Sequence, residues 1–134
     1  MTFDDTLSDL LARGIAVRFR ARGDSMHPAI RCGTPLQVDP VDTAAIRRGD
    51  VVLARQPRGL TAHRVVRIDG RLITTRGDNC ALEDPPFPSE HLLGRITSTG
   101  SGALTRFSHR HRRLIAALCL CWRGVISFKK EKHA

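Results

Sequence analysis

The stretch RRGDVVLARQPRGLTAHRVVRIDGRLITTRGD, residues 47–78, decides the fold class of this chain. It contains three apolar, largely β-branched segments of strand length, residues 51–55, 63–68 and 72–75. Turn sequences separate these segments, and the pair Asp69-Gly70 suits a tight hairpin. The stretch therefore predicts a mostly β domain.

Further strand-sized segments flank this stretch. Residues 15–20 alternate between apolar and basic side chains, which predicts a strand with Ile15 on its apolar face. Residues 36–38 and 93–97 have the length and composition of strands as well. The segment DPPFPSE, residues 84–90, contains three prolines that remove backbone donors, so we expect an ordered loop or a rigid crossing without regular structure there.

One helix is expected near each end of the chain. Residues 4–13 place leucines at helical spacing, and Gly14 provides a natural stop. Residues 114–128 are predominantly apolar and are flanked by basic residues, which predicts an amphipathic or apolar helix outside the β body. We therefore divide the chain into a domain over residues 1–105 and a tail over residues 106–134.

The positive charge of the chain is concentrated in this tail. The net charge is +9, of which residues 106–134 contribute +7 and residues 1–105 only +2. The aromatic content is 4% without any tyrosine, so the domain lacks the stacking platform of single-strand binders, and we do not expect nucleic acid as a partner. Residues 106–128 instead suit an anionic membrane surface, the alternative being a helix docked on the β body or on a partner.

No metal, cofactor or export signal is expected. Two histidines and the two cysteines of the tail are each separated by one residue, so on a helix the members of a pair would point to opposite faces, which does not suit zinc. No segment reaches the ~20 apolar residues that a spanning helix needs, and no signal peptide precedes the domain. We therefore expect a cytoplasmic protein, peripheral on the inner face of the membrane if the tail binds lipid. The cysteines are expected to be reduced thiols: Cys32, Cys80, Cys119 and Cys121.

The segment GDSMHP, residues 23–28, contains a candidate nucleophile. Gly23 lets the backbone turn sharply after the preceding strand, so that Ser25 is presented at the edge of a sheet. Surface turns use the same residue types, so the segment alone does not identify a site. GDSL-type esterases share the GDS sequence, but no Asp-x-x-His follows Ser25 and the chain is short for their α/β fold.

Five short motifs follow one another between residues 22 and 96, in the order SM-P, GDVV, HRVV, RGDN and GR. This order is similar to that of type I signal peptidases and related LexA-type peptidases. The resemblance implies a coiled β-sheet domain with serine endopeptidase activity on a peptide or protein substrate. It also implies that Ser25 is the nucleophile.

The general base implied by the resemblance is a histidine. The superfamily often uses a lysine, but the lysines of this chain are Lys129, Lys130 and Lys132, outside the motif-bearing region. His63 stands where the archaeal and endoplasmic-reticulum signal peptidases have a histidine. A free imidazole, with a pKa of ~6.5, accepts a serine proton near neutral pH, so a pair of Ser25 and His63 is chemically consistent.

Two carboxylates are candidates for the group that orients the base. Asp84 occupies the position that resembles the triad aspartate, and we favour it as the orienter. Asp78 lies in the GDN turn, where we expect it to make turn and supporting hydrogen bonds. The oxyanion hole would use backbone N–H groups of Ser25 and Asp24, because Gly23 replaces the serine that many signal peptidases carry there.

A second hypothesis comes from another class of protein. Without the side-chain donor, catalysis could be ~100-fold slower or more. The chain could then be a catalytically weak or inactive peptidase-fold module that binds or regulates, with its basic tail on membrane or nucleic acid. In either case five residues are expected to shape the site: Gly23, Met26, Pro28, Gly77 and Asn79.

Overall fold

The computed structural model describes residues 2–99 and 102–103, which form one helix and eight strands. Short 3-10 turns lie at Thr43–Ala45 and Ser89–His91. The elements are, in chain order, α1 Phe3–Ala12, β1 Val17–Arg20, β2 Pro35–Asp39, β3 Val51–Gln56, β4 Gly59–Asp69, β5 Leu72–Arg76, β6 Phe87–Pro88, β7 Leu92–Thr99 and β8 Gly102–Ala103.

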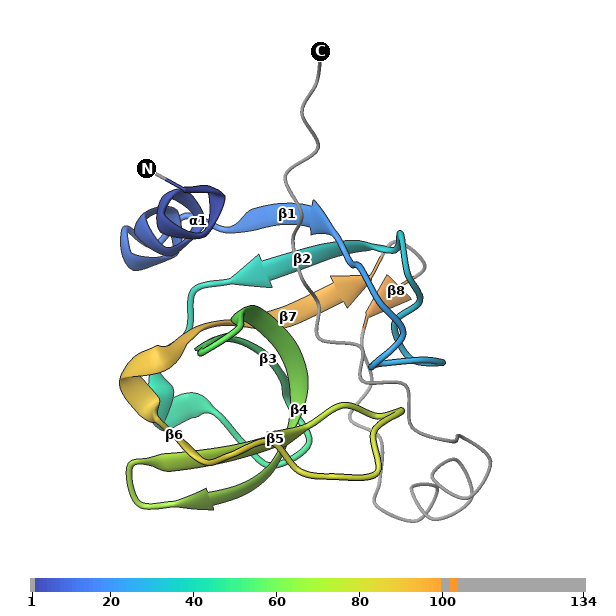
Figure 1. Ribbon diagram of the computed structural model, residues 1–134. Coiled ribbons are helices and arrows are strands. Elements are labelled where there is room, and N and C mark those ends of the chain that lie inside the picture. Colours follow the sequence, from blue (N-terminus) through green and yellow to red (C-terminus); the bar gives the residue numbers. More distant parts are fainter. Residues whose placement is uncertain (1, 100–101, 104–134) are drawn as a thin grey trace.

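The strands pair in one antiparallel sheet that curls on itself (Figure 1). The strand order is β1-β2-β7-β3-β4-β5-β6, and β8 pairs with β7. Helix α1 packs against β1 and β7. The predicted mostly β fold with a short N-terminal helix is therefore confirmed, whereas the helix expected at residues 114–128 lies outside the described residues.

The middle of the sheet is buried on both of its faces. In β3, Val51 and Leu53 belong to one apolar cluster, and Val52 and Ala54 belong to the other. Because successive side chains of a strand point to opposite faces, a continuous apolar run such as this one fits a strand that is covered on both sides. Burial of each such side chain contributes roughly 1.5–3 kcal/mol, so β3 anchors the neighbouring strand β4 firmly.

Helix α1 begins with a capping box. The Thr2 hydroxyl accepts a hydrogen bond from Asp5 N, and the Asp5 carboxylate accepts one from Thr2 N. The backbone and side-chain hydrogen bonds from Thr2 lower the pKa of Asp5 from its usual value. On the opposite side of the helix, Leu7 and Leu11 are buried in the core, as their helical spacing predicts.

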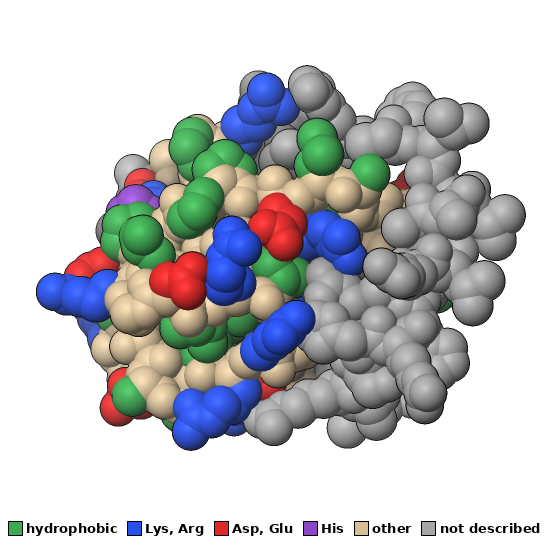
Figure 2. Space-filling view, turned by 90° about the horizontal axis from the view of Figure 1, so that it is seen from below, with side chains coloured by type: hydrophobic (Ala, Val, Ile, Leu, Met, Phe, Trp, Pro, Cys, Tyr) green, Lys and Arg blue, Asp and Glu red, His purple; other side chains and the backbone are tan. Residues whose placement is uncertain are grey.

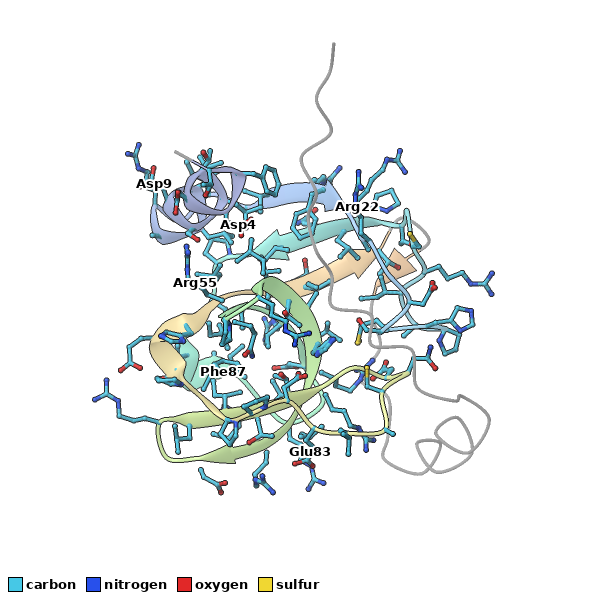
Figure 3. All side chains as sticks on the ribbon, in the orientation of Figure 1. Asp4, Asp9, Arg22, Arg55, Glu83 and Phe87 are labelled. Carbon is cyan, nitrogen blue, oxygen red and sulfur yellow. The ribbon has the colours of Figure 1, made fainter. Side chains whose placement is uncertain are left out.

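Two sequence-based expectations are wrong. Ile15 is 47% exposed, and its backbone N–H donates a hydrogen bond to Leu10 O at the end of helix α1. Ile15 is therefore not part of the strand, which begins at Val17. The proline-rich segment is not irregular throughout, because β6 pairs with Leu72 and Ile73 and a 3-10 turn follows it. Phe87 supplies the apolar anchor of this segment, and Figure 3 shows it inside the curl of the sheet, whereas Glu83 lies on the outside.

Charged and hydrophobic side chains are interspersed on the described part of the face in Figure 2. Several exposed arginines are neutralised by nearby carboxylates, as in the ion pairs of Arg67 with Asp69 and of Arg71 with Glu90. Such exposed pairs contribute little to stability, typically about 0–1 kcal/mol. They do, however, balance the charge of the domain, in line with its small net value.

Candidate active site

The loop between β1 and β2 presents the candidate nucleophile. Gly23 adopts a positive φ of 84°, a conformation that other residues rarely take, and the chain then forms a turn over Ser25. Met26, the next residue of this loop, is buried with 1% of its surface exposed. Ser25 itself is only 1% exposed, whereas Pro28 is exposed at the loop surface.

The candidate base comes from the middle of β4. His63 pairs across the sheet with Val52 of the anchored strand β3, and only 5% of its surface is exposed. Its Nε2 atom lies 3.1 Å from Ser25 Oγ, although the two residues are 38 positions apart in the chain. The proximity of Ser25 and His63 expected from the sequence is therefore confirmed.

The second nitrogen of His63 faces a carboxylate. Its Nδ1 lies 2.5 Å from Asp84 Oδ2, and the Asp84 side chain is 23% exposed. An ionised carboxylate only accepts hydrogen bonds, so Nδ1 must carry the proton. In the neutral ring this leaves the lone pair on Nε2, pointing at the Ser25 hydroxyl.

Asp78, the other carboxylate considered from the sequence, is engaged elsewhere. Its two oxygens accept hydrogen bonds from Arg64 Nε and Nη2, both at 2.8 Å, and Arg64 Nη1 donates to Gly49 O. The Arg64 side chain is only 4% exposed, which makes this a largely buried ion pair. The structure thus brings Asp84 to the histidine, and Asp78 to an arginine on the same strand.

The turn at residues 77–80 holds the Ser25 loop in place. Asn79 donates from its backbone N to Ser25 O at 2.8 Å and from its side-chain Nδ2 to Asp24 O at 3.0 Å. Asp24 is exposed, and its carbonyl oxygen also accepts a hydrogen bond from His27 N. The predicted site-shaping residues at this turn therefore lie against the loop that carries the serine.

Gly77 is required by the closeness of this approach. An added Cβ at this position would lie 2.6 Å from Ser25 O, 2.7 Å from Cys80 Sγ and 3.1 Å from His63 Nε2. Carbon atoms essentially never approach backbone oxygen so closely, so any side chain would push the turn away from the serine. A glycine with an ordinary φ is needed here for space rather than for conformational freedom.

Two site residues were missed in the sequence. Thr75 donates its hydroxyl to Asp84 Oδ2 at 2.7 Å, and no local pattern distinguishes it from other strand threonines. Arg64 is the second residue of the HRVV motif, and the motif alone does not assign it a role. A basic side chain between apolar strand residues was the available signal, since a buried charge normally has a partner.

Within the described residues, no cluster of histidine, cysteine, aspartate or glutamate side chains has an arrangement that could hold a metal ion. The same part of the chain contains no helix long and apolar enough to cross a membrane.

The chain from Ser25 through His63 to Asp84 is the arrangement by which serine hydrolases activate a hydroxyl. The family model of Peptidase S24-like proteins matches residues 6–97, more than half of the chain, and this range includes all three residues. The chain belongs to the Peptidase S24-like family, within the superfamily of LexA-type and signal peptidases. No curated protein matches the chain.

Proposed function

We propose that this protein is a serine endopeptidase in which Ser25 is the nucleophile, His63 the general base and Asp84 the group that orients the base. One observation supports this proposal above all: the unbroken hydrogen-bond chain of Ser25, His63 and Asp84, with distances of 3.1 and 2.5 Å. It occurs on a domain of a peptidase family, which makes peptide hydrolysis the first chemistry to test.

The proposed reaction proceeds through an acyl-enzyme. Ser25 Oγ forms a bond to the carbonyl carbon of the substrate while His63 Nε2 takes the hydroxyl proton. His63 then gives this proton to the leaving amine as the peptide C–N bond breaks. A water molecule, deprotonated by His63, hydrolyses the ester, and the proton returns to Ser25. Backbone N–H groups of Ser25 and Asp24 are the proposed donors to the oxyanion.

We also propose that the chemistry follows the Ser/His branch of the superfamily. Residues 1–128 contain no lysine, so a lysine base would have to come from the last six residues of the chain. The position of His63 against Ser25 supports the histidine alternative. As in signal peptidases, the proposed substrate is a peptide or protein with small side chains at the cleavage site, and the proposed location is cytoplasmic or peripheral on the inner face of the membrane.

A fluorophosphonate probe tests the proposal directly, because it phosphonylates activated serines without requiring a known substrate. We expect mass spectrometry to find one adduct on Ser25, to find none in Ser25→Ala, and to find the adduct retained in Ser89→Ala. If folded protein acquires no adduct on Ser25 while a known serine hydrolase is labelled in parallel, the proposed activity is wrong. A binding or regulatory role would then be the better hypothesis.

A further inference from the structure

Asp84 is tied to strand β5 by a single residue, Thr75. The Thr75 hydroxyl donates to Asp84 Oδ2 at 2.7 Å, and Asp84 N donates to Thr75 O at 2.8 Å. Asp84 itself lies between β5 and β6, in a segment without helix or strand. Thr75 is 2% exposed and belongs to the sheet, so it connects a loop carboxylate to a rigid element.

The two hydrogen bonds of the Asp84 carboxylate converge on one atom. Oδ2 accepts from Thr75 Oγ1 and also faces His63 Nδ1 at 2.5 Å. A carboxylate oxygen has two lone pairs, so the direction of one hydrogen bond constrains the direction of the other. The Thr75 hydroxyl therefore sets how Asp84 presents Oδ2 to the imidazole.

We propose that Thr75 is a positioning residue of the site. Its hydroxyl orients Asp84, and Asp84 in turn keeps the proton of neutral His63 on Nδ1 and the lone pair on Nε2, toward Ser25. The effect on catalysis rests on the proposed peptidase function. The coupling of Thr75 to the tautomer of His63 does not, because it follows from the hydrogen bonds of the resting protein.

Three variants separate this role from a purely structural one. Thr75→Val removes the hydroxyl and keeps a β-branched side chain in the strand, whereas Thr75→Ser restores the hydroxyl. Thr74→Val is the matched control, because Thr74 is also buried in β5 but, as the adjacent residue, points to the opposite face. Should Thr75→Val not fold, as judged by circular dichroism, Thr75→Ala takes its place.

The tautomer is measured by long-range proton–nitrogen correlation in protein labelled with ¹⁵N-histidine, with His63 assigned by its loss in His63→Gln. We expect the Nδ1-protonated form in the wild type, in Thr75→Ser and in Thr74→Val, and a mixture of tautomers in Thr75→Val. The rate of fluorophosphonate labelling should fall about ten- to a hundredfold in Thr75→Val alone, the scale of one lost hydrogen bond to a charged group.

An unchanged tautomer in Thr75→Val would overturn the proposal, even if labelling slows, because Thr75 would then act through stability alone. Equal tautomer changes in Thr75→Val and Thr74→Val would overturn it as well. If the wild type is not labelled at all, but the tautomer responds as expected, the proposed peptidase function fails and the positioning role of Thr75 stands.

Discussion

Among the single residues of the site, His63 links Ser25 to Asp84 because each of its two ring nitrogens contacts one of them. Nε2 faces the Ser25 hydroxyl, and Nδ1 faces the Asp84 carboxylate. Nε2 can accept the serine proton only when the ring is neutral, since an imidazolium has no lone pair, whereas Nδ1 donates to Asp84 in either form of the ring. Deprotonation of Ser25 should therefore depend on this residue.

We predict that fluorophosphonate labelling of Ser25 requires His63 as the acceptor of the hydroxyl proton. His63→Ala should slow labelling by ~100-fold or more, the usual contribution of a general base, and Asp84→Asn should have a milder effect. The measurement is the labelling rate of each variant beside that of the wild type. If His63→Ala keeps the wild-type rate while Ser25 is still required, the base is another group, and His27 is the first to test.

Gly77 gives a second prediction at this scale. In Gly77→Ala the new methyl group would clash with Ser25 O, so we expect a loss of stability of about 1–3 kcal/mol together with strongly reduced labelling. Gly94→Ala is the control, because its Cβ would lie 2.7 Å from Asp39 O, a comparable clash with backbone. Urea unfolding measures the stability of both variants, and fluorophosphonate labelling measures the reactivity of Ser25 in each. Normal labelling of Gly77→Ala would contradict the prediction.

At the scale of elements, strand β4 organises the site from both of its faces. His63 and Arg64 are adjacent and point to opposite faces. His63 reaches Ser25 directly, and Arg64 binds Asp78 in the turn that in turn hydrogen-bonds the Ser25 loop. Strand β4 therefore supports the position of Ser25 in two ways, directly through His63 and indirectly through Arg64.

We predict that Asp78→Asn destabilises the protein by about 3 kcal/mol, because it removes one charge of the largely buried Arg64–Asp78 ion pair. Asp9→Asn, which removes the exposed partner of Arg13, should change stability by less than about 0.5 kcal/mol. Urea denaturation of the two variants makes the comparison. Equal destabilisation would show that the Arg64–Asp78 pair contributes no more to the free energy of unfolding than an exposed ion pair.

At the scale of the whole molecule, the positive charge is concentrated near the C-terminal end of the sequence. Both apolar clusters of the described structure lie between Leu7 and Ile96, and the family match covers residues 6–97. Residues 106–134 carry +7 of the net charge of +9. We propose that the tail binds an anionic membrane surface and that the domain performs its chemistry beside it.

We predict that the full chain floats with vesicles containing anionic lipid, that it floats less as salt is raised, and that it does not float with neutral vesicles. A chain truncated after Thr105 should remain unbound and still be labelled on Ser25. Equal flotation of the two chains would rule out membrane binding through the tail. Lost labelling in the truncated chain would show that the tail contributes to the domain.

The strand-sized segments could be read from local patterns because apolar and β-branched side chains reveal a buried strand wherever it pairs. The residues at which strands begin and end could not be predicted as well from these patterns. Ile15 was assigned to a strand because its side chain continues the alternation, but its N–H is used by the end of the helix. Phe87 and Pro88 were assigned to a loop because proline lacks a donor, but their pairing with β5 needs only the remaining backbone groups.

The sequence by itself determined the mostly β class and, through the order of its motifs, the peptidase superfamily, and it singled out Ser25 and His63 as candidates. These properties reside in residue types and in short-range spacing. Only the tertiary structure decided which carboxylate faces the histidine, and that Thr75 and Arg64 belong to the site. The physical reason is that these contacts join different strands and loops, and their distances are set by how the whole sheet curls.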